Sequence, residues 1–528
     1  MKSKSIRQNG VKRRVSTCLA VTVLVSAAGV TATATAKTPP PVFLPGYDPA
    51  DQQTNFLTFL GKFIPEDPGT ARAYYNAIDP LGEKVTFTQW LVKAGFIGKE
   101  SDWHPEGAQD IRTGQPAGVY GPNIINTDSH VIVINNADLG FVRNQFIRCE
   151  PSCTAKNPVI YTYLENYPVD IKKDDGLPTV ELDGFPTAAE AKAAIQDAFA
   201  NRQGRIADVA FEWAPPPDGS APSRRYGQLY AYVFHKDSTT QEITETRDWF
   251  NDPTVLDGAK FNARGPEEFP PLDPIVAGEP FAPELDGLGF KQHPGVCFMC
   301  HGGSPQALSG TNEYPSQGRV SGFKFLPLDI PNLLFTSNDP NDPLSRAAQE
   351  AQIKRYNQAV LITHGASPPK TAGGAWKVPK ITDEQGVTRA THAVETILGW
   401  YGGATMPNAT QDTEFVPVGW REAANGGKAP AGSERLYLEA VAPACRSCHF
   451  QRGIDADFGT VASFDANKSD ILELALKPEC DAANPPPGKR VMPAARRTYD
   501  LFWLNNQDEL VKTHFGFTST SYCDLHAE

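Results

Sequence analysis

In its first half, the chain contains short runs in which apolar and polar residues alternate, a pattern that predicts half-buried β-strands. The runs richest in aromatic and β-branched residues are 130–135, 159–163 and 226–235. Apolar residues at helical spacing predict two helices among these strands, one over 87–95 with Trp90 and Leu91 facing inward and one over 188–202. This mixture of elements predicts an α+β domain with an antiparallel sheet.

The second half has a different pattern, in which short helical segments are separated by proline-rich stretches. An amphipathic helix is predicted over 433–441, because Leu436, Tyr437 and Val441 recur at helical spacing. Another helical stretch, 496–503, is rich in aromatic residues. The second half is therefore predicted to be mainly α-helical.

These patterns divide the chain into four expected parts, so the predicted fold class is multidomain. A signal peptide, an α+β domain of unknown function, a first helical domain and a second helical domain are expected over 1–36, 37–290, 291–425 and 430–528. Residues 251–294 contain many prolines and few periodic segments, and they form the expected linker between the two halves.

The N-terminal segment has the three parts of a secretory signal peptide. Six basic residues precede an apolar run from Leu19 to Val30, and a small-residue cleavage site follows at residues 34–36. The apolar run is too short to span a bilayer as a helix, although an uncleaved anchor is the alternative. We expect a periplasmic or secreted protein with no stable membrane span after cleavage.

Eight cysteines remain when Cys18 is removed with the signal peptide, and four of them belong to two C-x-x-C-H motifs. The motif residues are Cys297, Cys300 and His301 in the first and Cys445, Cys448 and His449 in the second. Two cysteines at this spacing reach the two vinyl groups on one edge of a porphyrin, and the adjacent histidine then offers its imidazole to the iron. Two covalently bound c-type haems are therefore the predicted cofactors.

Two other chemistries use closely spaced cysteine pairs. A thioredoxin-like dithiol occurs in a βαβ setting, but Pro443 lies just before the second motif and two glycines directly follow the first. A zinc ribbon places both cysteine pairs on one metal, whereas here a histidine follows each pair at once and the pairs lie 148 residues apart. Haem is favoured over both.

The other four cysteines are expected to form disulfides, because an exported chain meets an oxidising compartment. Cys149 and Cys153 are expected to bridge a local turn. Cys480 and Cys523 are expected to attach the C-terminal tail to the second helical domain.

The region around the second motif resembles class I cytochrome c domains. The residues that carry the resemblance are Leu436, Tyr437, Cys445, Cys448, His449, Met492 and Pro493. In that family, the helix that leads into the motif packs against a C-terminal helix, and a Met-Pro pair in a later loop carries the distal iron ligand. The resemblance implies that Met492 is the sixth ligand of the second haem.

The sixth ligand of the first haem has three alternatives. Met406 also precedes a proline, but it lies 105 residues after its motif, against 43 for Met492; the Pro/Asn/Asp-rich insertion 327–343 can absorb the difference. His364 and His392 compete for the position, and an iron without a sixth protein ligand is the third alternative. A thioether raises the reduction potential relative to a second imidazole, whereas an open position permits peroxide or oxygen chemistry.

The net charge restricts the partners. It is formally −12, and removal of the six basic residues of the signal peptide leaves −18. Nucleic acid is not an expected partner, because phosphate binding needs basic surface. An acidic surface suits docking to a basic redox partner protein.

These features predict an exported di-haem c-type cytochrome that transfers electrons. One alternative is a di-haem peroxidase-like oxidoreductase with one open haem, for which no distal glutamine or glutamate is evident. Another is a partner- or polymer-binding module with a cytochrome tail. His104, His130 and His235 of the α+β domain have no catalytic motif around them, so no catalytic residue is assigned.

Intact-mass analysis of the natively matured protein should find a chain without residues 1–36 that carries two tetrapyrroles, because each motif supplies two thioether bonds. A mass equal to that of the polypeptide alone would contradict the haem hypothesis.

Overall fold

A computed structural model describes part of the chain. The described residues are 74–76, 78–102, 127–136, 140–167, 169, 172–174, 177–179, 188–200, 207–217, 219, 222–236, 243–247, 297, 300–301, 323–382, 386, 388–451, 456–476, 498, 501–503 and 505–517. The expected signal peptide, the linker 251–294, Met492 and the pair Cys480 and Cys523 lie outside these residues.

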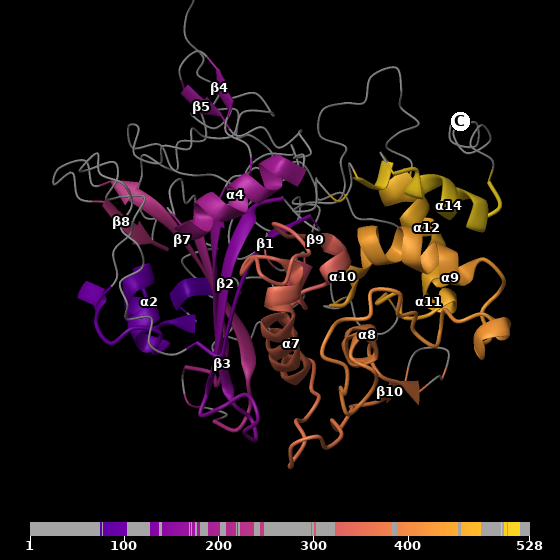
Figure 1. Ribbon diagram of the computed structural model, residues 1–528. Coiled ribbons are helices and arrows are strands. Elements are labelled where there is room, and N and C mark those ends of the chain that lie inside the picture. Colours follow the sequence, from indigo (N-terminus) through magenta and orange to yellow (C-terminus); the bar gives the residue numbers. More distant parts are fainter. Residues whose placement is uncertain are drawn as a thin grey trace, which may run out of the picture. The chain divides into compact units, whose positions relative to one another are not determined.

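An antiparallel sheet forms the centre of the first half (Figure 1). Its strands are β1 Ser129–Asn135, β2 Val142–Glu150, β3 Val159–Tyr167, β6 Ala207–Ala214, β7 Tyr226–Lys236, β8 Ile243–Thr246 and the two-residue β9 Leu333–Leu334. Their order is β8-β7-β6-β3-β2-β1-β9, and every neighbouring pair is antiparallel. Two small hairpins pair β4 Lys172–Asp174 with β5 Leu177–Thr179 and β10 Ile381–Thr382 with β11 Thr388–Arg389. The predicted α+β class with an antiparallel sheet is confirmed.

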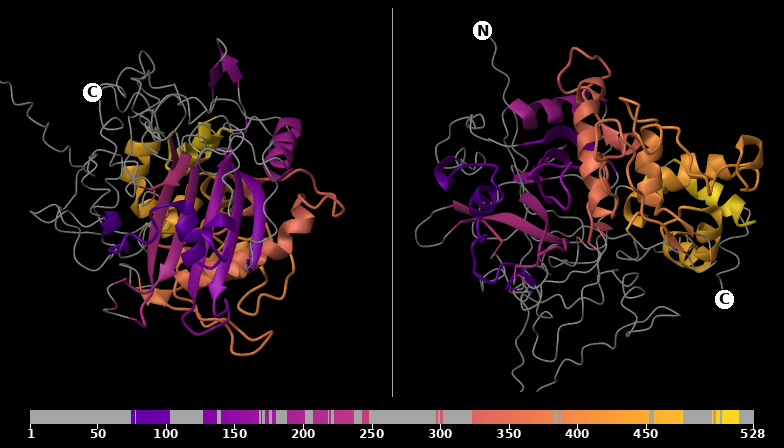
Figure 2. Two further views of the ribbon diagram at one scale, coloured as in Figure 1. Left: turned by 90° about the vertical axis from the view of Figure 1, so that its left-hand side faces the viewer. Right: turned by 90° about the horizontal axis from the view of Figure 1, so that it is seen from below.

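Helices cover both faces of this sheet (Figures 1 and 2). The helices α2 Phe87–Lys93 and α4 Ala188–Ala200 lie on one face, where Trp90 contacts the rings of Tyr161 and Tyr163. The helix α7 Arg346–Thr363 lies on the other face, where the Tyr356 hydroxyl accepts a 2.6 Å hydrogen bond from Gln145 of β2. The sheet is therefore the middle layer of three.

The backbone groups of β1 that face away from β2 are hydrogen-bonded by residues from the second half of the chain. The side-chain amide of Gln349 in α7 accepts from the Ile132 N–H at 2.7 Å and donates to the Ile132 carbonyl at 3.0 Å. The strand β9 continues the ladder at Ile134 and Asn135. A sheet edge with unpaired backbone groups is thus covered by α7 and β9.

Short helices make up much of the second half. They are α8 His392–Trp400, α9 Ser433–Leu436, the π-helix η6 Tyr437–Cys445, α10 Arg446–His449, α11 Val461–Ala466, α12 Lys468–Ile471, the π-helix η7 Leu472–Leu476 and α14 Gln507–His514. Short 3₁₀ turns occur at η2 Glu100–Asp102, η4 Ile330–Asn332 and η5 Ala423–Asn425. Among the described helices, none combines the length and apolar character needed to cross a bilayer.

Most elements predicted from sequence patterns are present, but four strands of the sheet, β2, β6, β8 and β9, were not predicted. The predicted helical stretch 496–503 lies partly outside the described residues. The predicted strands correspond to β1, β3 and β7, and the predicted helices to α2, α4 and the continuous segment of α9 and η6. The strand β2 escaped prediction because polar residues interrupt its alternation. Two of these polar residues are buried and paired in the structure, Asn144 with Glu165 and Gln145 with Tyr356.

One buried core joins the two halves of the chain. It contains sheet residues together with residues from 323 to 450, and Phe211 of β6 packs against Phe323 and Phe325 at ring-centroid distances of 5.7 and 5.9 Å. A second core contains residues between 416 and 511. The predicted domain boundary near residue 290 lies outside the described residues. Described residues before and after that boundary belong to the same buried core.

The contact between β7 and Phe323 requires a glycine at position 227. A Cβ atom on Gly227 would meet the Phe323 ring and would lie 2.7 Å from the Phe323 carbonyl oxygen. We expect Gly227→Ala to lower the free energy of unfolding by about 1–3 kcal/mol, the usual cost of overpacking, measured as the urea midpoint at constant slope. Adding Phe323→Ala removes the ring contact but leaves the Phe323 carbonyl in place, so it should reduce without abolishing the cost of the glycine substitution in a double-mutant cycle. Equal costs in both backgrounds would contradict the ring contact.

Candidate functional site

The first C-x-x-C-H motif packs on the sheet face that carries α7. Its described residues, Cys297, Cys300 and His301, have helical backbone. The His301 ring lies 4.8 Å from the ring of Phe211 in β6 and 5.1 Å from that of Phe323. His301 Nδ1 donates to the Lys324 carbonyl at 3.0 Å. Burial lowers the pKa of His301 to about 4, so its imidazole is neutral at neutral pH.

The second motif follows the π-helix η6 and forms α10. Its two cysteines are three residues apart on this continuous helical segment and therefore lie on one side of it. His449 Nδ1 donates to the Ala456 carbonyl at 2.7 Å, and its ring stacks on Phe458 with centroids 3.7 Å apart. Both motif histidines are thus held in the same way, by a main-chain carbonyl at Nδ1 and a phenylalanine ring.

This arrangement fits an imidazole that ligates iron. A carbonyl that accepts from Nδ1–H fixes the tautomer in which Nε2 carries the lone pair, and such outer bonds orient metal-ligating histidines. Each motif offers two cysteines that can form thioethers with a porphyrin and one imidazole that can ligate its iron, which is the set of groups that holds a covalently attached haem. The residues present therefore fit the cofactor that the sequence predicts.

The structure brings the two motifs together. The Sγ atoms of Cys300 and Cys448 lie 3.4 Å apart, although 148 positions separate them in the chain. Gln451, two residues after His449, donates to the Phe325 carbonyl at 3.3 Å. The two predicted sites are therefore neighbours.

The sulfur positions do not form a four-thiolate metal site. All four motif cysteines are described, yet no three of their sulfurs lie within 4.8 Å of one another. A structural zinc ion needs four ligands in tetrahedral contact. The geometry thus disfavours the zinc alternative.

Burial also disfavours a reactive dithiol. The pKa values of Cys297 and Cys445 are raised to about 12 by burial. A thiol–disulfide oxidoreductase needs a cysteine with a lowered pKa, because the thiolate is the nucleophile. These two thiols are instead neutral at neutral pH.

A buried ion pair anchors the second motif. Arg446, between its two cysteines, donates from Nε to Asp329 Oδ2 at 2.8 Å and from Nη2 to Oδ1 at 2.7 Å. Both side chains are almost fully buried, with relative exposures of 1% and 3%. Burial raises the pKa of Asp329, while Arg446 acts in the opposite direction. This anchor was missed at the sequence level, since its partners lie 117 positions apart.

Hydrogen bonds extend this ion pair into a buried network. The Tyr437 hydroxyl is 3.1 Å from Arg446 Nη1 and 2.9 Å from His392 Nε2. His392 Nδ1 donates to the Asp457 carbonyl at 2.6 Å, and the Asp457 carboxylate binds Arg389 at 2.6 Å. Both ring nitrogens of His392 are therefore occupied, and this histidine connects α8 to the second core.

The other two candidate ligands of the first haem lie at different places along α7. Met406 is buried at a φ of 46°, with its sulfur 3.9 Å from Gln358 Nε2 in the middle of the helix. His364 caps the helix C-terminus, and its Nε2 lies 3.1 Å from the Phe325 carbonyl and 2.9 Å from Gln451. Its Nδ1 is buried without a hydrogen-bond partner among the described residues. Burial lowers its pKa to about 3.

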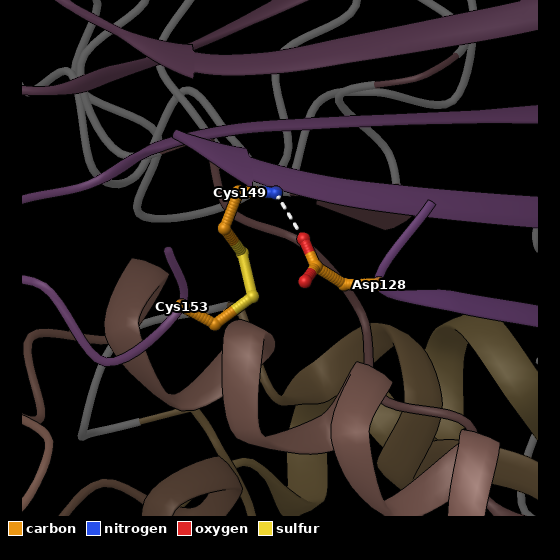
Figure 3. A group of neighbouring side chains, drawn as sticks. All are labelled: Asp128, Cys149 and Cys153. Carbon is orange, nitrogen blue, oxygen red and sulfur yellow. Dashed lines mark hydrogen bonds between the residues drawn. A yellow bond between two sulfur atoms is a disulfide. The ribbon is translucent and has the colours of Figure 1, made fainter. Parts of the chain in front are cut away.

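Another group of ligand-type side chains lies at the end of β2 (Figure 3). The ligand atoms of Asp128, Cys149 and Cys153 lie within 4.8 Å of one another. The two cysteines form the predicted disulfide, and the Asp128 carboxylate accepts from the Cys149 N–H at 2.7 Å. This group stabilises a turn.

His130 is also held within the sheet, stacked on Phe146 with centroids 4.2 Å apart.

A cleft of about 1010 Å³ lies beside the second motif. It is lined by residues 330 and 331, 333–338, Leu438, Ala442, Pro443 and Arg446, among others. Of the second motif, Arg446 lines the cleft, whereas none of the motif cysteines or histidines does.

Comparisons with known proteins give no assignment: no protein-family model, no curated protein and no solved structure matches this chain.

Arg446→Met should leave Asp329 as an uncompensated buried carboxylate. We expect a loss of about 3–5 kcal/mol in the free energy of unfolding at pH 7. The unpaired carboxyl should have a folded pKa above its unfolded value, so stability is retained below the unfolded pKa and lost as pH rises through the folded pKa. Urea unfolding at pH 7 and near pH 4 measures this difference.

The matched control is Arg446→Met combined with Asp329→Asn, which removes the buried charge and keeps the shape. This double variant should recover much of the loss at pH 7 and lose the pH dependence. Equal destabilisation of the single and double variants would show that the ion pair does not anchor the motif.

Proposed function

We propose that this protein is an exported di-haem c-type cytochrome that transfers electrons. The observation that carries the proposal is the common arrangement of His301 and His449, each tied through Nδ1 to a main-chain carbonyl and preceded by its pair of cysteines. When bound, haem supplies a one-electron couple. The chain supplies two thioether attachments and one imidazole ligand at each site.

The packing around the second motif supports a cytochrome c-like domain there. In the family that this region resembles, the helix before the motif packs against a C-terminal helix. Here Leu436, Tyr437 and Val441 of α9 and η6 share a core with Val511 of α14. Met492 is the proposed sixth ligand of the second haem, on the basis of the sequence resemblance.

The surroundings of the first motif support a different kind of pocket. Phe211 of the sheet and Phe323 contact His301, so the α+β half would form one wall of the first haem site. Met406 is the ligand proposed from the sequence. His364 is the alternative. Two observations favour it: its Nδ1 has no hydrogen-bond partner among the described residues, and its Nε2 lies near both the Phe325 carbonyl and Gln451.

The proposed cellular location follows from the predicted signal peptide, and the proposed partner follows from the net charge. The protein would act in the periplasm or outside the cell, after removal of residues 1–36, and its acidic surface would dock a basic redox partner protein.

A spectral redox titration of the purified holoprotein tests the proposal. We expect two haems that are reduced reversibly in one-electron steps, with at least one showing the ferric absorption of methionine ligation. Met492→His should remove the contribution of the second haem to that absorption and lower the midpoint potential of this haem, because imidazole replaces thioether.

Met406→Leu is the matched control. It should leave the methionine signal of the second haem in place and should alter only the first haem if Met406 ligates it. Absence of haem, or a Met492→His variant with unchanged spectra and potentials, would contradict the proposed ligation.

A further inference from the structure

We infer that Cys300 and Cys448 attach the two haems side by side, so that the two sites behave as one electronically coupled centre. The inference rests on the proposed function, because both motifs must carry haem for it to apply. It goes beyond that function, since two attachment motifs in one chain can also serve two independent sites.

The contact between the two sulfurs is the main observation. The Cys448 thiol donates a hydrogen bond to Cys300 Sγ over 3.4 Å, and neither cysteine is part of a disulfide. Each of these sulfurs would form its thioether with a vinyl group of its own porphyrin. Sulfurs at this distance would therefore hold the two substituted porphyrin edges next to each other in space.

The segment 324–332 provides a second, independent reason for a fixed pair, because it bonds both motifs. Its Lys324 carbonyl accepts from His301 of the first motif. Its Asp329 binds Arg446 in the second motif. Asn332 Nδ2 of the same segment lies 3.4 Å from the Ser447 hydroxyl. One short stretch of chain therefore sets the distance between the motifs.

This segment is itself rigidly supported. Asp329 and Asn332 are buried, and Asn332 Nδ2 donates to Asp329 Oδ2 at 3.1 Å. The Leu328 N–H and carbonyl bond the Asn357 amide of α7 at 2.8 and 3.0 Å. Because the segment is fixed to α7 and α7 to the sheet, the two motifs cannot separate without breaking buried hydrogen bonds.

Two measurable consequences follow from close attachment. An electron at one site places a unit charge beside the other in a buried environment of low dielectric constant, so the second electron enters at a lower potential. Two chromophores in contact also mix their strong transitions, which gives a two-signed circular dichroism couplet in the Soret region. Independent sites show neither effect.

The test compares the holoprotein with two one-haem variants. Cys297→Ser/Cys300→Ser removes the first attachment, and Cys445→Ser/Cys448→Ser removes the second. Intact mass first counts the haems in each protein. We expect the Soret couplet in the holoprotein to be absent from the summed spectra of the two variants. At least one remaining site should titrate at a higher midpoint potential than in the holoprotein.

The outcomes separate this inference from the proposed function. A holoprotein with two haems whose spectrum and midpoint potentials equal those of the two variants taken together would overturn the coupled pair and leave the cytochrome assignment intact. A holoprotein without haem would overturn the proposed function itself. If either variant fails to fold, the holoprotein alone decides: electron paramagnetic resonance of the oxidised form should show interacting irons, and the signals of two isolated centres together with no Soret couplet would overturn the inference.

Discussion

The buried ion pair between Arg446 and Asp329 is the constraint on which the arrangement of the site depends. A charge in the interior is costly unless an opposite charge and hydrogen bonds compensate it. Arg446 lies inside the second motif, so this requirement forces α10 onto the segment that follows the first motif. Tyr437 and His392 extend the compensation to α8. The ion pair therefore also fixes the position of Cys445 and Cys448, because they lie on either side of Arg446 in the chain.

The antiparallel sheet has a structural part in the same site. Gln349 and β9 close the edge of β1, and Gly227 leaves room for Phe323, whose ring contacts His301. The first motif therefore packs on a surface to which both halves of the chain contribute, with Phe211 of β6 and Phe323 against the His301 ring. Such a shared core differs from the arrangement of two self-contained helical domains joined to an unrelated α+β domain. The first half of the chain therefore packs against the first motif, through Phe211 of β6.

Burial sets the ionisation states of several motif residues. Burial keeps Cys297 and Cys445 as thiols and His301 as neutral imidazole. A zinc site would gather thiolates on one metal, and a dithiol oxidant would expose a thiolate; neither condition is met by these residues. The haem attachment that we propose would use the thiols of each motif and an imidazole whose Nδ1 is already bonded. The same low dielectric that holds these groups neutral would strengthen any interaction between two redox centres.

Local features were predictable from the sequence by itself. The two C-x-x-C-H motifs, the Cys149–Cys153 disulfide, and helices such as α2 and α4 depend on residues only a few positions apart, so one short pattern contains all their chemistry. The tertiary structure alone decided the strand β2, the ion pair of Arg446 and the contact between Cys300 and Cys448. The polar residues of β2 are buried because partners on other strands and on α7 satisfy them. Partners more than a hundred positions apart leave no periodic signal, since only folding brings them within bonding distance.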